Sequence, residues 1–261
     1  MVARRKSFLD KLLYVVAPGD ARGVGFFDRM VLAATGAEDA WAARRSDPRE
    51  ARVMDMVAAQ SARAGMKPPK LIVYQSHVPN AFSIYSGNLA VGTNLLDIMT
   101  PQQVAAVMGH ELAHHSHIGR DASVTLGLPM AGGAAVAGAV PYAWRNRSAK
   151  NRLAFVAAAT AGLGACMVLP RAWQRSCELE ADQESVEKFG HRPEAMAGAL
   201  ESLQQRMAEL HKNRPPSSMP QVVRDLLATH PPLKLRIDLL KRKAEAQQRG
   251  DQAFANGASL G

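Results

Sequence analysis

Four histidines and one glutamate lie within eight residues, in the stretch GHELAHHSHIGR. His110 and His114 are four positions apart, so a helix places both imidazoles on one face, one turn apart, where a single ion can contact both. Glu111 follows the first histidine, and its carboxylate can reach a water molecule bound to that ion. The pattern His-Glu-x-x-His on a helix therefore predicts a zinc site with a general base beside it.

The segment that carries this pattern has the features of a helix. Pro101 stands just inside a start at Thr100, and apolar residues follow at helical spacing. The apolar residues are Val104, Ala105, Val107, Met108 and Leu112. A five-residue pattern of this kind arises by chance in about one per cent of chains of this length, and a His-rich surface helix would also contain it. The metal assignment therefore depends on finding further ligands.

A catalytic zinc ion needs a third protein ligand and an open fourth position. His117 is one candidate, because it lies two turns after His110 on about the same helical face. The metzincin pattern has its third histidine at the position of Arg120, so that class of peptidase is excluded.

A downstream acidic segment, SCELEADQESVEKFG, offers the alternative ligand. Its first glutamate, Glu178, shares a helical face with Asp182, whereas Glu180 points away from that face. One carboxylate as ligand, with a second one that orients a metal-bound histidine through its other ring nitrogen, is an arrangement that zinc sites use. A solvated acidic helix would show the same composition.

Four motifs in order resemble the zinc metallopeptidase family of the bacterial heat-shock protease HtpX and the CAAX prenyl proteases. They are PNAFSIYSGNLAVGTNLL at 79–96, HELAH at 110–114, ELEAD at 178–182 and ATHPPLKLRIDLL at 228–240. The resemblance covers about two thirds of the chain. Cys177 and Leu179 stand where the family often has charged or aromatic residues, but neither is a ligand position.

The resemblance implies a role for each residue of the metal motifs. It makes His110, His114 and Glu178 the ligands of one zinc ion per chain, with water at the fourth position. Glu111 would take the proton of that water as it attacks the scissile carbonyl, and would later return it to the leaving amine. Asp182 would orient a ligand histidine.

Two further roles concern the substrate. His230 is our candidate donor to the oxyanion, and its alternative role is that of a cap or turn residue ahead of Pro231. The segment Asn80, Ala81 and Phe82 would hold a polypeptide substrate by strand addition, a role assigned by the resemblance.

The remaining patterns predict an α+β, predominantly helical fold. A helix begins at Pro48 and closes at Gly65, KLIVYQSH reads as a strand, and AFSIYSGNLAVGT reads as a hairpin with its turn near Ser86-Gly87-Asn88. Helices are also expected from Pro193 to about Leu210 and after His230-Pro-Pro. With the resemblance, this implies a zincin-like catalytic domain with a small β-hairpin or sheet and an inserted hydrophobic helical hairpin.

Two uncharged runs separate the metal motifs. Ala122 to Trp144 and Leu153 to Pro170 contain no charged residue, and the basic stretch RNRSAKNR joins them. Their lengths suit a pair of membrane-spanning helices. The alternative is a hairpin that packs within a soluble fold or only dips into lipid. The basic residues prefer the cytoplasmic side, which would place the zinc helices outside and conflicts with the free thiols described below.

These features divide the chain into four parts. Residues 1–46 form an N-terminal amphipathic segment, 47–121 and 171–250 form the metallopeptidase domain, 122–170 form the inserted hairpin, and 251–261 form a frayed tail. The N-terminal stretch MVARRKSFLDKLLYVVAPG makes a poor signal sequence and is too short to span, so we expect its helical stripe to dock on the core or to lie in a membrane interface.

Net charge and cysteine content limit the classes of binding partner and the cellular compartment. The net charge is +9, but aromatic residues make up only 5% and no nucleic-acid motif accompanies the charge, so nucleic acid is excluded and an anionic membrane surface is favoured. The two cysteines, Cys166 and Cys177, form no disulfide framework and fit a reducing compartment. We expect a membrane-associated protein with a cytoplasmic catalytic domain, the alternative being a soluble cytoplasmic one.

The sequence therefore predicts a zinc endopeptidase in membrane-associated protein quality control. One alternative is a non-catalytic, zinc-stabilised membrane scaffold or chaperone-like binder, against which the presence of Glu111 argues. The other is a prenyl-peptide protease, against which the small hairpin argues. The sequence indicates neither the physiological substrate nor the oligomeric state.

Overall fold

The computed structural model describes residues 48–84, 87–145, 148–212, 228 and 230–258. The expectations for residues 1–46 lie outside this part of the chain. The described chain is mostly helical and contains one three-stranded sheet. It divides into two compact units. Unit 1 is Met1–Ser116, Ala181–Asn213 and Leu233–Gly261, and unit 2 is His117–Glu180 and Arg214–Pro232.

Unit 1 begins with the predicted helix and strand. Helix α4 spans Glu50–Arg63, and Gly65 follows it with a φ of 65°, a left-handed conformation that favours glycine after a helix. Strand β1 spans Lys70–Tyr74. Both elements confirm the interpretation of these segments.

The sheet has the strand order β1-β3-β2. Strand β2 (Ala81–Ile84) pairs antiparallel with β3 (Asn88–Gly92), which confirms the predicted hairpin, and β3 pairs parallel with β1. Every residue of the central strand β3 is buried. Strand β2 lies at one edge of the sheet, which matters for the site below.

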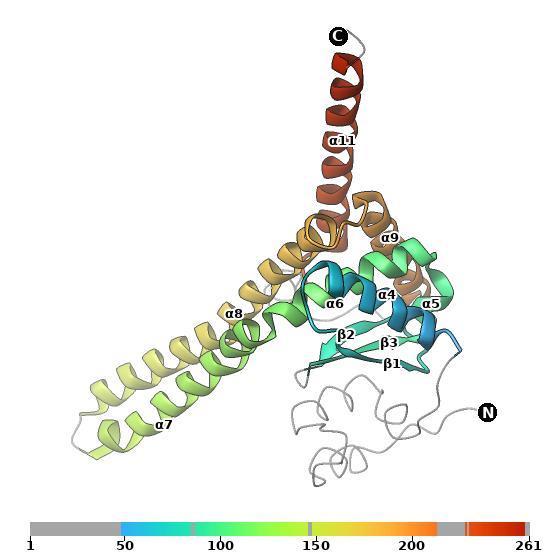
Figure 1. Cartoon of the computed structure of the whole chain (residues 1–261). Coiled ribbons are helices and arrows are strands. Elements are labelled where there is room, and N and C mark those ends of the chain that lie inside the picture. The colour runs from blue at the N-terminus through green and yellow to red at the C-terminus, as the bar shows by residue number, and fades with distance from the viewer. Residues whose placement is uncertain (1–47, 85–86, 146–147, 213–227, 229, 259–261) are drawn as a thin grey trace. The chain divides into compact units, whose positions relative to one another are not determined.

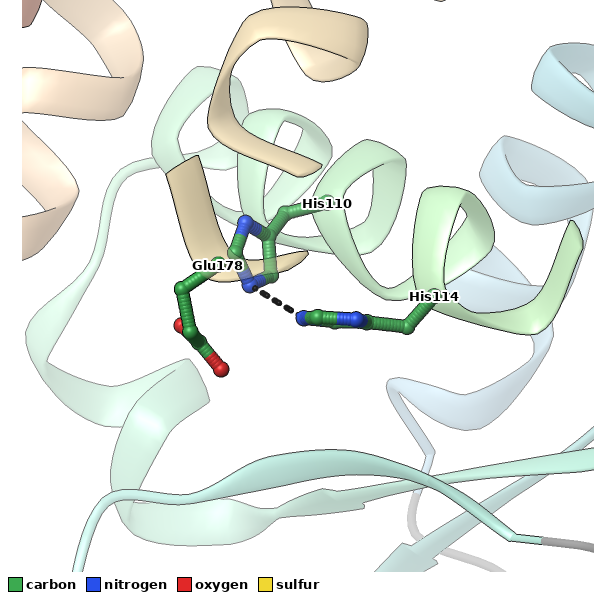
Figure 2. Close-up of side chains that lie close together, drawn as sticks. All are labelled: His110, His114 and Glu178. Atoms are coloured by element: carbon green, nitrogen blue, oxygen red, sulfur yellow. Dashed lines mark hydrogen bonds between the residues drawn. The ribbon is translucent and has the colours of Figure 1, made fainter. Parts of the chain in front are cut away.

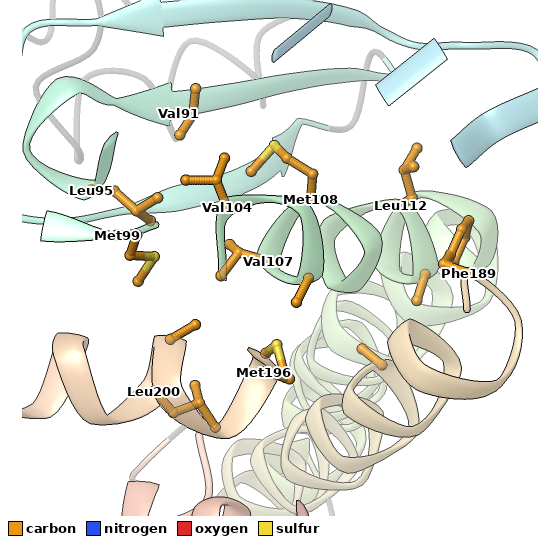
Figure 3. Packing of buried hydrophobic residues seen from close by; sticks show 14 of the residues in the cluster. Val91, Leu95, Met99, Val104, Val107, Met108, Leu112, Phe189, Met196 and Leu200 are labelled. Atoms are coloured by element: carbon orange, nitrogen blue, oxygen red, sulfur yellow. The ribbon is translucent and has the colours of Figure 1, made fainter. Parts of the chain in front are cut away.

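The helix with the His-Glu-x-x-His motif is α6 (Pro101–Ala122), preceded by the short helix α5 (Thr93–Ile98). Val104, Met108 and Leu112 form a stripe one turn apart that faces the sheet (Figure 3). On the other side, Val107 faces helix α9 (Pro193–His211) (Figure 3). Because apolar contacts bury the metal helix on two sides, its polar residues are held on a rigid support.

The last helix, α11 (Leu233–Ala258), packs against α9. Its buried residues Ile237, Leu240 and Ala244 recur at helical spacing, so they form the face that docks. The helix continues to Ala258, whereas the sequence predicted a frayed tail from residue 251. A helix that is anchored by one buried face continues through its own backbone hydrogen bonds, and the segment KAEAQQ is rich in good helix formers.

Unit 2 contains the end of α6, a π-helical turn at Ser123–Gly127, α7 (Leu128–Arg145) and the first part of α8 (Ala149–Glu187). Pro129 lies two residues after the π-turn, and in a regular α-helix its ring would clash with the carbonyl of Thr125, four residues earlier. Helices α7 and α8 run side by side (Figure 1), so closely at Gly132 that an added Cβ would collide with the thiol of Cys166. The uncharged run ends at Pro170, but helix α8 continues through this proline to Glu187.

Two helical stretches, Pro101–Arg145 and Lys150–Glu187, are long and apolar enough to cross a membrane by length and composition. In the most apolar 18-residue segment of each stretch, the buried share is 0% for the first and 6% for the second. Large apolar side chains accordingly project from both helices. Nine of the thirteen exposed large apolar side chains of the described residues lie there: Leu128, Met130, Val140, Trp144, Leu153, Val156, Leu163, Met167 and Leu169.

Candidate metal centre

The two histidines of the metal motif approach each other through their Nε2 atoms. His110 and His114 lie one turn apart on α6, and their Nε2 atoms are 3.1 Å apart. Two imidazole nitrogens that bind one zinc ion tetrahedrally are about 3.3 Å apart, because each zinc–nitrogen distance is about 2.0–2.1 Å. The ring nitrogens therefore have a spacing that a shared zinc ion requires.

Asp182 contacts the other nitrogen of the first histidine. Its Oδ1 lies 2.9 Å from Nδ1 of His110, and both residues are buried. A carboxylate at this distance favours the form of the ring that carries its proton on Nδ1, which leaves the lone pair of Nε2 for an ion. This is the contact that the predicted orienting role requires.

Arg236, at the start of α11, holds Asp182 from the opposite side. Its Nε donates to Oδ2 at 2.7 Å and its Nη2 donates to Oδ1 at 2.6 Å. Burial alone would raise the pKa of Asp182, but the hydrogen bonds from His110 and Arg236 outweigh burial and hold the pKa below its ordinary value. Asp182 is therefore a carboxylate with charged or polar donors on both oxygens.

The position of Arg236 in the sequence carries a signal of this role, which the metal motifs alone do not contain. Leu233, Ile237 and Leu240 form an apolar stripe on α11, and Arg236 lies within it and is only 5% exposed. A charged residue inside a buried stripe needs a partner of opposite charge.

Glu178 lies one turn before Asp182 on the same helix, so the two carboxylates share a face. The nitrogen and oxygen atoms that His110, His114 and Glu178 can offer to a metal ion all lie within 4.8 Å of one another (Figure 2). Two imidazoles and one carboxylate are a donor set that catalytic zinc sites use.

The structure places His230 against Glu178. Its Nδ1 lies 2.8 Å from Oε1 of the glutamate, and its side chain is 66% exposed. In a neutral ring the Nδ1 proton would go to the carboxylate, and Nε2 would then be an acceptor. The predicted donation to an oxyanion would therefore need both ring nitrogens to be protonated.

His117, the other candidate third ligand, belongs to a different group, with Glu180 and Glu184. Both carboxylates of that group have cationic partners. Arg120 donates to both oxygens of Glu180, at 3.0 and 2.6 Å, and Lys188 lies 3.2 Å from Glu184. The carboxylates of this second group are thus already partly neutralised.

Glu111 is buried beside the edge strand of the sheet. Its carbonyl oxygen accepts a hydrogen bond of 2.8 Å from Oγ of Ser83 on β2. The residue as a whole is only 8% exposed. The predicted substrate segment begins this strand, where the carbonyl of Asn80 accepts from the amide of Gly92 at 2.8 Å and Phe82 pairs with Ala90. The edge strand and the proposed general base are thus adjacent.

Tyr74, at the end of β1, is a further buried polar residue that sequence reasoning missed. Burial raises the pKa of its phenol to about 12, the charge of Glu111 raises it further, and the nearby polar side chains of Asn80 and Ser76 lower it. The centroid of its ring lies 5.9 Å from that of Phe82. Tyr74 therefore stays a neutral phenol, and its ring packs against Phe82 of the predicted substrate segment.

Gly109 precedes the first histidine and allows a close approach. A Cβ at this position would lie 2.8 Å from Cδ2 of His191 and 3.1 Å from Oγ of Ser185. That hydroxyl also donates to the carbonyl of Ala106 at 2.7 Å. The metal helix is therefore pinned to the end of α8 and the following loop just before His110.

The chain matches Peptidase family M48 over residues 46–244, which is more than half of its length. The matched region contains all four motifs on which the resemblance was based. That family covers zinc metallopeptidases of the HtpX and CAAX prenyl protease types, so the resemblance is confirmed. The two imidazoles and the carboxylate described above thus lie in a zinc-dependent peptidase, and the chain belongs to peptidase family M48.

Proposed function

We propose that this metallopeptidase is an endopeptidase in which His110, His114 and Glu178 hold one zinc ion. The observation that carries the proposal is the convergence of these three donors, with ligand atoms within 4.8 Å of one another. The contact of Asp182 with Nδ1 of His110 supports it, because it directs the second ring nitrogen toward the other donors.

When bound, zinc would act as a Lewis acid toward water and toward the scissile carbonyl. Glu111 would take the proton from the attacking water and return it to the leaving amine. The position of Glu111 beside β2 supports this role, because the hydrogen bond from Ser83 holds the backbone of this residue next to the proposed substrate strand. Asp182 would keep His110 in one tautomer throughout.

His230 would hold Glu178 through its Nδ1 in addition to its proposed role as oxyanion donor. The 2.8 Å contact supports the holding role directly. Donation to an oxyanion from Nε2 would require a proton on both ring nitrogens.

The substrate would be a polypeptide held along β2. This strand is at the edge of the sheet, so its outer backbone groups can pair with an extended peptide. The hydrogen bond from Ser83 to the carbonyl of Glu111 would place that peptide next to the general base. Asn80, Ala81 and Phe82 would form the start of this binding strand.

The hairpin of α7 and α8 would associate the enzyme with a lipid bilayer. At its tip, the ring of Trp144 contacts Phe155, with centroids 6.4 Å apart, and Arg152 lies 6.0 Å from the Trp144 ring. At its base, Arg120 lies 5.4 Å from the ring of Trp173. Tryptophan and arginine pairs at both ends of an apolar helix resemble the aromatic belts of membrane proteins.

The distance between the two belts supports the same proposal. Phe155 and Trp173 are eighteen positions apart on one continuous helix, or about 27 Å at 1.5 Å per residue. The hydrocarbon core of a bilayer is about 30 Å thick.

Two features of the hairpin favour opposite topologies. The free thiols of Cys166 and Cys177 support a cytoplasmic location for the catalytic side, whereas the basic residues Arg145 and Lys150 favour a cytoplasmic location for the tip of the hairpin. Labelling of a Ser148→Cys variant from each side of membrane vesicles decides between the two.

The decisive experiment compares wild type with Glu111→Gln. Both purified proteins are analysed for zinc and assayed for casein cleavage, with a chelator and zinc readdition as controls. We expect one zinc per chain in both, and a loss of cleavage of about 10²–10⁴-fold in the variant, the range for removal of a general base.

The rival functions predict different results in this experiment. A zinc-stabilised membrane scaffold or chaperone-like binder would hold zinc but leave casein intact in both proteins. A prenyl-peptide protease would leave casein intact and cleave prenylated peptides. Equal cleavage by wild type and Glu111→Gln would eliminate the mechanism. A role in membrane protein quality control requires the further observation that unfolded membrane proteins are cleaved.

A further inference from the structure

We propose that Arg236 is a positioning residue of the metal centre, which holds the Asp182 carboxylate against Nδ1 of His110. This inference rests on the proposed function, because it assumes that His110 is a zinc ligand. It extends the centre from α6 and α8 to the C-terminal helix α11, at a sequence separation of 54 residues from Asp182.

The geometry is that of a two-point attachment. The Arg236 guanidinium uses Nε for Oδ2 and Nη2 for Oδ1 of Asp182, at 2.7 and 2.6 Å. A bidentate contact fixes the plane of the carboxylate as well as its position. Oδ1 also lies 2.9 Å from Nδ1 of His110, so the orientation of the carboxylate determines that of the imidazole.

Burial makes this contact more than an ordinary ion pair. The exposed fractions of His110, Asp182 and Arg236 are 5%, 4% and 5%. A buried ion pair is a poor source of stability, because desolvation of both charges offsets their attraction and an apolar pair of similar volume often serves as well. The docking of α11 already has the apolar contacts of Ile237, Leu240 and Ala244. The buried charge pair therefore needs another explanation, and the orientation of His110 supplies one.

Loss of Arg236 would leave the Asp182 carboxylate without its two-point attachment. A buried carboxylate without its guanidinium partner is free to turn. A misoriented carboxylate no longer faces Nδ1 of His110, so Nε2 would no longer be directed to one position. Removal of such an outer partner typically lowers metal affinity about 10–100-fold.

The test measures zinc affinity by competition with a chromogenic chelator in Arg236→Met, Arg236→Lys and wild type. Arg242→Met is the matched control, since Arg242 lies on the same helix and is exposed. We expect Arg236→Met to bind zinc about 10–100-fold more weakly, the control to match wild type, and Arg236→Lys to fall between. Lysine keeps the charge but cannot make the two-point contact.

Peptide kinetics at saturating zinc separate positioning from folding. We expect kcat to fall in Arg236→Met while KM changes little, because substrate binding by β2 is untouched. Circular dichroism and thermal unfolding report the folded fraction of each variant. Unchanged zinc affinity in a folded Arg236→Met protein, or wild-type affinity in Arg236→Lys, would overturn the proposal.

A double variant protects the test against a general folding defect. If Arg236 acts through Asp182, then Asp182→Asn combined with Arg236→Met should bind zinc no more weakly than Asp182→Asn alone. Additive losses would mean that Arg236 acts elsewhere. Failure of the proposed function is a different result, namely a wild-type protein that binds no stoichiometric zinc.

Discussion

The two units of this peptidase depart in opposite ways from the usual rule that apolar side chains are buried and charged ones are exposed. Unit 1 buries charged and polar groups, among them His110, Glu111, Asp182 and Arg236. Unit 2 exposes large apolar groups along α7 and α8, such as Met130 at 67% and Leu153 at 71%. Either arrangement is costly in water unless something compensates for it.

The compensation differs between the units and indicates what each does. In unit 1 the chain itself supplies the partners, since Asp182 receives donors from His110 and Arg236 on both oxygens. A satisfied buried network of this kind fixes side-chain orientation, which chemistry requires. In unit 2 the described residues cover almost none of the apolar surface of the two long helices, so lipid or another part of the chain has to cover it. We infer chemistry from the first departure and lipid contact from the second.

Removal of the hairpin should produce the largest change, which is the loss of membrane association. Complete covering of a large apolar side chain is worth about 1.5–3 kcal/mol, and the nine exposed ones of α7 and α8 are between 36% and 71% exposed, so covering them contributes about 7–14 kcal/mol. We expect the intact protein to sediment with membranes and to resist high-salt extraction. A variant without residues 122–170 should become soluble and still cleave casein.

The geometry at the hairpin base makes this deletion feasible. Nε1 of Trp173 lies 3.4 Å from Oδ1 of Asp121, and Sγ of Cys177 lies 3.3 Å from the same oxygen. A short glycine linker can therefore join Asp121 to Arg171 without moving either helix. Release of the intact protein by high salt would assign the membrane contact to basic residues on the surface and would contradict the lipid interpretation of the hairpin.

Loss of the third ligand should be the next largest effect. Removal of a residue that only orients a ligand lowers metal affinity by up to about 100-fold. We expect Glu178→Ala, which removes a ligand itself, to weaken zinc binding by more than this and to abolish cleavage. The matched control is Glu180→Ala, which removes the partly exposed pair with Arg120 and leaves His110, His114 and Glu178 in place. Zinc content by atomic absorption after dialysis distinguishes the two. Equal zinc in both variants would mean that Glu178 is not a ligand.

Much of this centre could be predicted from local sequence, and the rest could not. The spacing of His110 and His114 depends only on helix geometry, so the sequence was sufficient for their juxtaposition. Glu178 could be named because a recurring motif marks it. Arg236 and the contact of His230 with Glu178 depend on how the C-terminal segment packs, and no spacing within one helix encodes that.

The fold shows the same division. The hairpin of β2 and β3 and the starts of α4, α6 and α9 follow from turn and capping residues near each boundary. The passage of α8 through Pro170 does not, because proline normally signals an end or a kink. The helix continues on both sides of this proline, so a local helix breaker alone does not determine where the helix ends.

A Cβ added next to the first ligand should have a moderate effect on unit 1. Gly109→Ala would place a methyl group 2.8 Å from the ring of His191, so the ring or the metal helix must shift. We expect a loss of about 1–3 kcal/mol in the free energy of unfolding, measured with urea, together with weaker zinc binding.

Another glycine of the same helix provides the control. An added Cβ at Gly119 would meet no atom within 4 Å, so Gly119→Ala should be neutral or stabilise by about 0.5–1 kcal/mol. A second substitution, His191→Ala, should restore part of the loss in Gly109→Ala. If Gly109→Ala is as stable as wild type, the close contact at this point does not constrain the metal helix.

Removal of one hydroxyl from the edge strand should have the smallest effect. Ser83 donates from Oγ to the carbonyl of Glu111 at 2.8 Å, and we expect this bond to hold the substrate strand beside the general base. Ser83→Ala removes a hydrogen bond worth about 0.5–1.5 kcal/mol, which corresponds to a fall of about 2–10-fold in kcat/KM. The fall should be larger for an extended peptide that pairs along β2 than for a short peptide that reaches only the metal. Ser202→Ala, which removes a local bond to the carbonyl of Gly198 on α9, should leave both values unchanged. An equal fall for both peptides would mean that Ser83 supports the metal helix and not the binding of substrate along the strand.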